Sequence, residues 1–263
     1  MDASTARIGF IGFGNMAKAM AKGLVEHAGL DGSRITACAA HFDKLEASCK
    51  PLGANAVHTP TEVAEASDLT IVAVKPYMVA DVLAPAREAL AGKAVVSVAA
   101  GLLFDFYEDL LGAGSHHLST IPNTPIAVGC GVIACEQKHS LSDDEWETFT
   151  GLFGGIALIE PVAGHLLSTA SAVAGCGPAF AAMFLESLAD GGVKNGLPRA
   201  TAYRLAAQMM AGTAQLHLAT GTHPGAMKDA VCSPGGTTIK GVAALEAAGL
   251  RNALINAVDA TLK

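Results

Sequence analysis

Charged residues are scarce in this sequence, and they do not gather into a block of one sign. Only 16% of its 263 residues are Asp, Glu, Lys or Arg, whereas 51% are hydrophobic, and the formal net charge is −7 at pH 7. The absence of a lysine and arginine cluster argues against nucleic acid as a partner, because such binding depends on grouped cations. So little charge also leaves apolar surface uncovered, which indicates that another subunit covers part of it.

Paired cysteine motifs are also missing. No CxxC spacing occurs, so we predict free thiols with neither a zinc site nor a redox dithiol. The first ten residues lack a basic region followed by a long apolar stretch, and the longest apolar runs are too short or too interrupted by glycine to cross a bilayer. We therefore expect a cytoplasmic protein without metal or membrane association. The six cysteines are Cys38, Cys49, Cys130, Cys135, Cys176 and Cys232.

Short apolar runs alternate with helix-like segments through the first part of the chain. The runs cover residues 7–11, 35–40, 69–74, 94–99 and 131–135, and helical spacing occurs in residues 17–28, 61–66 and 79–90. Buried parallel strands have continuous apolar sequences, and their alternation with helices is typical of a doubly wound sheet. The sequence therefore predicts an α/β fold that begins with a Rossmann domain.

The residue composition of the sequence changes after about Glu160. Runs of β-branched residues stop, and Ala, Leu and Met recur at helical spacing to the end of the chain. Helices so rich in small residues can pack closely against a second copy of the chain. We therefore predict a dinucleotide-binding Rossmann domain over residues 1–160 and an all-helical domain for substrate binding and dimerisation over residues 161–263.

A glycine-rich motif follows the first apolar run. The segment from Gly12 to Ala17 matches G-x-G-x-x-G/A, with alanine at the permitted last position. The first glycine permits a tight turn, Gly14 allows the backbone to approach a pyrophosphate, and the next helix begins with unpaired N–H groups. A glycine-rich turn alone is weak evidence, but here it joins a strand to a helix. We predict that the cofactor is contacted by Ile11, Gly12, Phe13, Gly14, Asn15 and Met16.

The end of the second run bears on the choice of nicotinamide cofactor. NAD specificity usually requires an acidic side chain there, about twenty residues beyond the glycines, to hold the ribose 2′-hydroxyl. Residues 36–41 offer no carboxylate, and Asp43 is expected to lie beyond the strand end. The sequence therefore favours NADPH, with NADH as the weaker alternative. His41 and Lys44 are candidate contacts for the 2′-phosphate, although a solvated loop would explain both equally simply.

Two further runs end in small residues at the expected carboxyl edge of the sheet, where doubly wound folds bind ligands. The predicted cofactor contacts there are Ala73, Val74, Lys75 and Pro76 after one strand, and Val98, Ala99 and Ala100 after another. Lys75 could equally be an exposed loop lysine. Residues 121–125 form a double-proline turn in which Asn123 could bond either neighbouring backbone or a ligand.

Residues 233–239, SPGGTTI, stand out in the helical half. Two glycines expose successive backbone N–H groups immediately before an apolar helix, and helix N-termini bind anions such as carboxylates. In the alternative interpretation, Thr237 or Thr238 is a simple helix N-cap. The residues alone do not decide between these two readings.

The motifs together resemble the pyrroline-5-carboxylate reductase family, in the same order and over nearly the whole chain. The matching segments are GFIGFGNMA at 9–17, AVKP at 73–76, SVAAG at 97–101, PNTP at 122–125, GCGPAF at 175–180 and SPGGTTI at 233–239. The last two are the most distinctive. The resemblance implies an oxidoreductase of proline biosynthesis that transfers hydride from NADPH to the C=N carbon of 1-pyrroline-5-carboxylate. It also implies a homodimer, and rings of dimers occur in the family.

The resemblance assigns the substrate site to the helical half. It implies that the substrate carboxylate binds the backbone of Gly235, Gly236 and Thr237, while the catalytic hydroxyl of Thr238 faces the ring nitrogen. The chain departs from the family pattern at Ser119, where an arginine is usual, and at Ala40–His41, where the family often has a small polar residue and an arginine. A third departure is Cys176, which stands in place of a serine.

Two other functions are compatible with parts of the pattern. An NADP-dependent imine reductase or β-hydroxyacid dehydrogenase would share a Rossmann domain followed by helices. Such enzymes commonly use a lysine or aspartate in the interdomain helix, and residues 168–177 contain neither. A dinucleotide sensor without turnover is the second alternative, and the intact SPGGTT segment argues against it.

Overall fold

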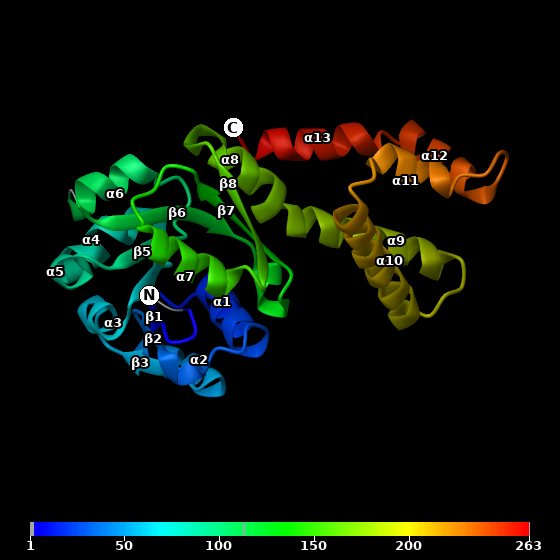
Figure 1. Cartoon of the computed structure of the whole chain (residues 1–263). Helices are drawn as coiled ribbons and strands as arrows, with labels where there is room; N and C mark the ends of the chain where they lie inside the picture. Colours follow the sequence, from blue (N-terminus) through cyan, green and yellow to red (C-terminus); the bar gives the residue numbers. More distant parts are fainter. Residues whose placement is uncertain (1–2, 113, 263) are drawn as a thin grey trace. The chain divides into compact units, whose positions relative to one another are not determined.

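The computed structural model describes residues 3–112 and 114–262, which form an α/β unit followed by a helical unit (Figure 1). The α/β unit contains one eight-stranded sheet with the order β3-β2-β1-β4-β5-β6-β7-β8. Neighbouring strands are parallel except β6 and β7, which are antiparallel. The strands are β1 Ile8–Ile11, β2 Ile35–Cys38, β3 Asn55–Val57, β4 Leu69–Val72, β5 Ala94–Ser97, β6 His116–Pro122, β7 Gly131–Glu136 and β8 Ala157–Val162.

Helices cover both faces of this sheet, as a buried parallel sheet requires. Neighbouring strand residues point to opposite faces, so Phe10 lies in one core cluster and Ile11 in the other. The first cluster packs against α1 and α7, and the second includes residues of α3, α4 and α6. The predicted doubly wound Rossmann-type fold is confirmed. The helices of this unit are α1 Asn15–Glu26, α2 Phe42–Cys49, α3 Pro60–Ala66, α4 Val79–Leu83, α5 Arg87–Leu90, α6 Phe104–Leu111, α7 Asp143–Phe153 and α8 Leu167–Ala170.

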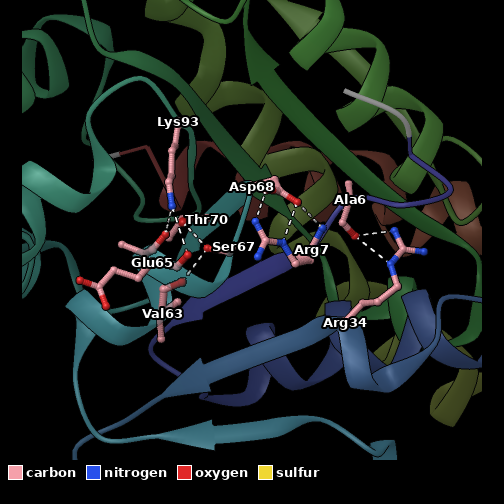
Figure 2. A network of polar contacts seen from close by, with 10 residues as sticks. Ala6, Arg7, Arg34, Val63, Glu65, Ser67, Asp68, Thr70 and Lys93 are labelled. Carbon is pink, nitrogen blue, oxygen red and sulfur yellow. Dashed lines mark hydrogen bonds and ion pairs between the residues drawn. The ribbon is translucent and has the colours of Figure 1, made fainter.

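A polar network ties together the amino ends of the central strands (Figure 2). The Arg7 guanidinium, immediately before β1, donates to the two carboxylate oxygens of Asp68, immediately before β4, at 3.1 and 2.6 Å. This contact lowers the pKa of the Asp68 carboxyl. Arg34, immediately before β2, donates from Nε to the Ala6 carbonyl at 2.9 Å. These contacts hold the strands in register at the edge opposite their carboxyl ends, which remain free to form a site.

The helical unit has almost no core of its own. Its buried apolar side chains, within the part of the chain that the structure describes, are only Ala189, Ala202 and Ala206. Long apolar side chains such as Met183 and Leu205 are 68% and 57% exposed. A unit with so little burial cannot offset the entropy of ordering its chain alone. Its helices are α9 Gly177–Lys194, α10 Arg199–Thr220, α11 Pro224–Ala230, α12 Thr237–Ala247 and α13 Leu250–Ala260.

The boundary between the two units lies later than predicted. The first unit ends at Gly175 and the second begins at Cys176, whereas residue 160 falls inside β8. Strand β8 pairs with β7 as far as Val162, so the sheet includes residues 161 and 162, which the composition assigns to the helical domain. The first unit also extends past the end of the sheet, because α8 and the π-helical segment Ser171–Gly175 still belong to it.

Two smaller expectations also need correction. Ile121 and Pro122 belong to β6, and the turn begins only after them.

The expectation that no apolar run is long enough to cross a membrane is wrong, because residues 164–194 form a helical stretch of sufficient length and apolar composition. The stretch includes α8, the π-helical segment Ser171–Gly175 and α9. Only 11% of its apolar window is buried.

Candidate functional site

A cleft of about 1020 Å³ opens at the carboxyl ends of the central strands. Strand β1 lies between β2 and β4. The chain runs from β1 through β2 to β3 toward one edge of the sheet and then crosses back to β4 on the other side of β1. Such a switch point is where open α/β sheets bind ligands. Every one of the sequence-predicted cofactor contacts lines this cleft, from the glycine motif after β1 to the small residues after β5.

The glycine motif has the geometry that a dinucleotide requires. Gly12 has φ +91°, and a Cβ atom there would lie 2.7 Å from both the Ala73 carbonyl oxygen and Val74 Cγ1. Only glycine can occupy this turn without strain. A Cβ at Gly14 would meet nothing within 4 Å, so the space beside it is open to a ligand. Gly14 also caps α1 without a side-chain hydrogen bond, which leaves the first N–H groups of the helix available for a pyrophosphate.

Acidic side chains are absent from the cleft lining in the described part of the chain. Beyond β2, the lining comes from Ala39, Ala40, His41, Lys44, Leu45 and Ser48, while Asp43 faces a separate hollow between α2 and β3. No carboxylate therefore stands where NAD-specific enzymes hold the ribose 2′-hydroxyl. The cleft accepts a dinucleotide and would not repel a 2′-phosphate.

The far wall of the cleft comes from the segments that follow β4 and β5. Ladder hydrogen bonds continue past the strand ends, with Ala73 N donating to the Ile11 carbonyl at 2.8 Å and Val98 N to the Val72 carbonyl at 3.0 Å. Small side chains therefore approach the cleft on a rigid backbone. Lys75 is exposed at its rim and has no ion-pair partner within residues 3–112 and 114–262. It can face a phosphate group of a bound dinucleotide.

Cys38, which lies beside the glycine motif, is an unreactive thiol. Cys38 ends β2, is 4% exposed and accepts the Gly12 N–H through its carbonyl oxygen at 2.9 Å. Burial raises the pKa of its thiol to about 11. The thiol therefore stays protonated at neutral pH and acts as a small apolar wall. No cluster of metal-ligating side chains occurs among the residues that the structure describes.

Asn123 and Ser119 hold structural positions outside the cleft lining. The Asn123 side-chain nitrogen donates to the Ala174 carbonyl at 3.0 Å, and its oxygen accepts from Val132 N at 2.8 Å. Of the two roles open to Asn123, the backbone role is therefore the one observed. Ser119 is buried in β6, and its Oγ has no hydrogen-bond partner among the described residues.

The predicted substrate segment forms a tight turn before α12. Gly235 has φ +68°, a conformation that favours glycine, and a Cβ at Gly236 would lie 2.4 Å from Ser233 Oγ, so the serine side chain would have to shift. Gly236 is itself the helix N-cap and makes no side-chain cap hydrogen bond. The interpretation of Thr237 or Thr238 as the cap is therefore wrong. Both threonines are exposed in the first turn of the helix, beside N–H groups that no side chain caps.

Comparisons with known proteins agree with this geometry. Residues 165–263 match the family model for pyrroline-5-carboxylate reductase dimerisation, and residues 7–101 match the model for NADP oxidoreductase, coenzyme F420-dependent. The pyrroline-5-carboxylate reductase of Treponema pallidum is 45% identical over 97% of this chain and 98% of its own length. The Escherichia coli enzyme of that name is 38% identical over 96% of this chain and 94% of its own length. The chain belongs to the pyrroline-5-carboxylate reductase family.

The family also accounts for the fold. A crystal structure of Plasmodium falciparum pyrroline carboxylate reductase with NADP bound superposes with a TM-score of 0.87 at 28% identity, covering 98% of this chain and 96% of that one. The resemblance predicted from the sequence motifs is thereby confirmed. The helical unit, which lacks a core, coincides closely with the region that the family model describes as dimerisation.

Proposed function

We propose that this chain is an NADPH-dependent reductase that converts 1-pyrroline-5-carboxylate to L-proline, the final step of proline biosynthesis. The observation that carries the proposal is the glycine turn at residues 233–236, which opens α12 without a capping side chain. Such a turn suits a small carboxylate, and the cleft after β1 suits the dinucleotide. Identities of 45% and 38% to reductases of this name, over nearly the full length of the chain, support the same substrate.

The residues of this chain divide the work between binding and proton handling. The N–H groups of the Gly235–Thr237 turn bind the substrate carboxylate, and the Thr238 hydroxyl contacts the ring nitrogen. The cofactor is held by the Gly12–Met16 turn and the small residues after β4 and β5, and when bound it supplies a hydride to the imine carbon. The ring nitrogen is basic enough to be protonated, so a hydroxyl that orients it suffices.

Preference for NADPH over NADH is part of the proposal. It is supported by the cleft lining beyond β2, where His41 and Lys44 are present and carboxylates are absent within the described residues. Titration of the cofactor-free protein with each cofactor measures it. Equal or tighter binding of NADH would refute it.

A homodimer completes the proposal. The exposed apolar residues of α9 and α10 need cover, and the match to a dimerisation model supports a second copy as that cover. The same cover explains the apolar stretch 164–194 without a membrane, and we expect the protein in the cytoplasm. Dimers that assemble further would form the rings that the family resemblance implies.

The decisive experiment follows the cofactor and the product at once. The protein is mixed with NADPH and racemic pyrroline-5-carboxylate, and the loss of absorbance is compared with the proline formed. We expect one proline for each NADPH consumed, and cofactor consumption without proline would refute the function. Parallel reactions with a cyclic imine lacking the carboxylate, and with a β-hydroxy acid plus NADP, separate the imine reductase and β-hydroxyacid dehydrogenase alternatives.

A further inference from the structure

Three side chains that can carry positive charge line one part of the cleft. His41 follows β2 and is the N-cap residue of α2, where its side chain makes no capping hydrogen bond. Lys44 lies in the first turn of the same helix, and His58 follows β3. All three line the cleft at the carboxyl ends of β2 and β3. In a Rossmann fold, the 2′ position of the adenosine ribose lies beside the end of β2.

The His58 ring is held in place by a neighbour. It stacks on Phe42, the first residue of α2, with ring centroids 3.9 Å apart and an interplanar angle of 16°. The backbone N–H of His58 donates to Glu62 Oε2 at 3.0 Å. The stack leaves the ring edge, with its two nitrogens, available to a ligand, and neither nitrogen makes a hydrogen bond to any residue that the structure describes.

The charged groups around His58 favour an anion in the cleft. The Glu62 carboxylate of α3, which accepts the His58 N–H, also completes the capping box of that helix by accepting from Thr59 N at 2.7 Å and Thr59 Oγ1 at 2.8 Å. On α2, Asp43 lines a different hollow, whereas His41 and Lys44 line the cleft. Glu62 interacts electrostatically with His58 but does not line the cleft, so the lining at this point consists of cationic and neutral groups.

We propose that His58, together with His41, recognises the 2′-phosphate of NADPH, so that the preference for NADPH weakens as pH rises. This inference rests on the proposed function and identifies a specificity-determining residue outside the glycine motif and the loop after β2. The usual family arginine beyond β2 is absent here, and a second histidine from the β3–α3 loop takes over part of its role.

Histidine differs from arginine in one testable respect. An imidazole gains its proton within the physiological pH range, whereas a guanidinium stays charged throughout. A phosphate dianion beside an imidazole favours the protonated form, so binding of NADPH takes up protons. NADPH affinity should therefore fall as pH rises above neutrality. NADH lacks the 2′-phosphate and should bind with little change.

The test is a fluorescence titration of the full-length protein with NADPH and with NADH from about pH 7 to about pH 8.5, a range in which the phosphate is mostly the dianion. We expect the wild-type Kd for NADPH to rise about tenfold and the Kd for NADH to change less than about twofold. His58→Gln should weaken NADPH binding about tenfold at pH 7, and its Kd for NADPH should change less with pH than the wild-type Kd does. His58→Phe, which retains a ring on Phe42, should behave like His58→Gln.

Two matched variants separate charge from titration. Lys44→Gln removes a cation from the same part of the cleft without removing an imidazole, so it should weaken NADPH binding at every pH and leave the slope unchanged. His27→Gln replaces an exposed histidine that does not line the cleft and should match the wild type. A wild-type slope in His58→Gln, or an equal slope for NADH, would overturn the proposal. Binding is measured without substrate, so a failure to form proline remains a separate result.

Discussion

Thr238→Ala tests whether the hydroxyl of this residue acts on the substrate or only on the helix. Thr238 is exposed in the first turn of α12, and Gly236 already serves as the N-cap. Removing the hydroxyl therefore removes no cap, and alanine favours the helix by up to about 0.7 kcal/mol. We expect the melting temperature to stay the same or to rise slightly.

The expected loss is catalytic. A donor aimed at a group whose charge changes in the transition state is commonly worth about a hundredfold in turnover, which is about 2.7 kcal/mol. Thr238→Ala should lose roughly that factor in kcat, while its Kd for NADPH barely moves. Thr237→Ala keeps its backbone N–H for the carboxylate and should lose less than about tenfold. Thr238→Ser keeps a hydroxyl and should recover most of the activity.

Steady-state kinetics, cofactor titration and melting curves on the three variants provide the measurement. A helix-capping role predicts the opposite pattern, with about 0.5–2 kcal/mol of stability lost and near-normal turnover for each folded molecule. Full activity in folded Thr238→Ala would therefore refute the role assigned to this hydroxyl. Equal losses in the two alanine variants would refute the distinction between side-chain and backbone contributions.

Four further results are expected. Gly12→Ala should lose about 2–4 kcal/mol of stability in denaturant titrations, because its Cβ would lie 2.7 Å from the Ala73 carbonyl oxygen at a φ of +91°. Gly14→Ala has open space and should fold normally but bind NADPH at least about tenfold more weakly. Light scattering at micromolar concentration should report at least twice the 26.6 kDa chain mass, and a stable monomer would contradict the dimer. Burial lowers the pKa of His117, so below about pH 6.5 the unfolded chain binds a proton that the native state does not. The free energy of unfolding should therefore decrease as the pH falls below this value. His117→Gln should reduce this pH dependence of the melting temperature.

The sequence predicts the sheet best where strands are buried on both faces. The runs containing β1, β2, β4, β5 and β7 are continuous and apolar, and all were located within about two residues of their ends. Strands β3, β6 and β8 were not identified. Strand β3 lies at the sheet edge, β6 carries two histidines and a proline, and β8 combines exposed and half-buried residues. Their pairing depends on neighbours distant in sequence, which no local pattern contains.

The sequence predicted most of the residues that line the cleft, but it did not predict His58 or the N-cap of α12. Glycine spacing and strand ends were enough to name the residues that gather in the cleft, because the topology of a doubly wound sheet brings carboxyl ends together. His58 was missed, since a lone histidine after a short edge strand carries no pattern. Its stack on Phe42 is the signal, and only the folded chain brings the two rings together. The identity of the α12 cap likewise required the backbone geometry of Gly236.

The sparse substrate segment suits the charge of the reacting group. Hydride adds most readily to a protonated imine, and a full positive charge on a neighbouring side chain would disfavour that protonation. The turn at residues 233–239 contains no lysine or arginine, so in the proposed site the carboxylate would be bound by N–H groups that together carry only about half a charge. A helix N-terminus can therefore hold the carboxylate while opposing protonation of the ring nitrogen less than an arginine would. Replacing Thr237 by lysine would strengthen carboxylate binding but should lower kcat, and a parallel rise in both affinity and kcat would contradict this reasoning.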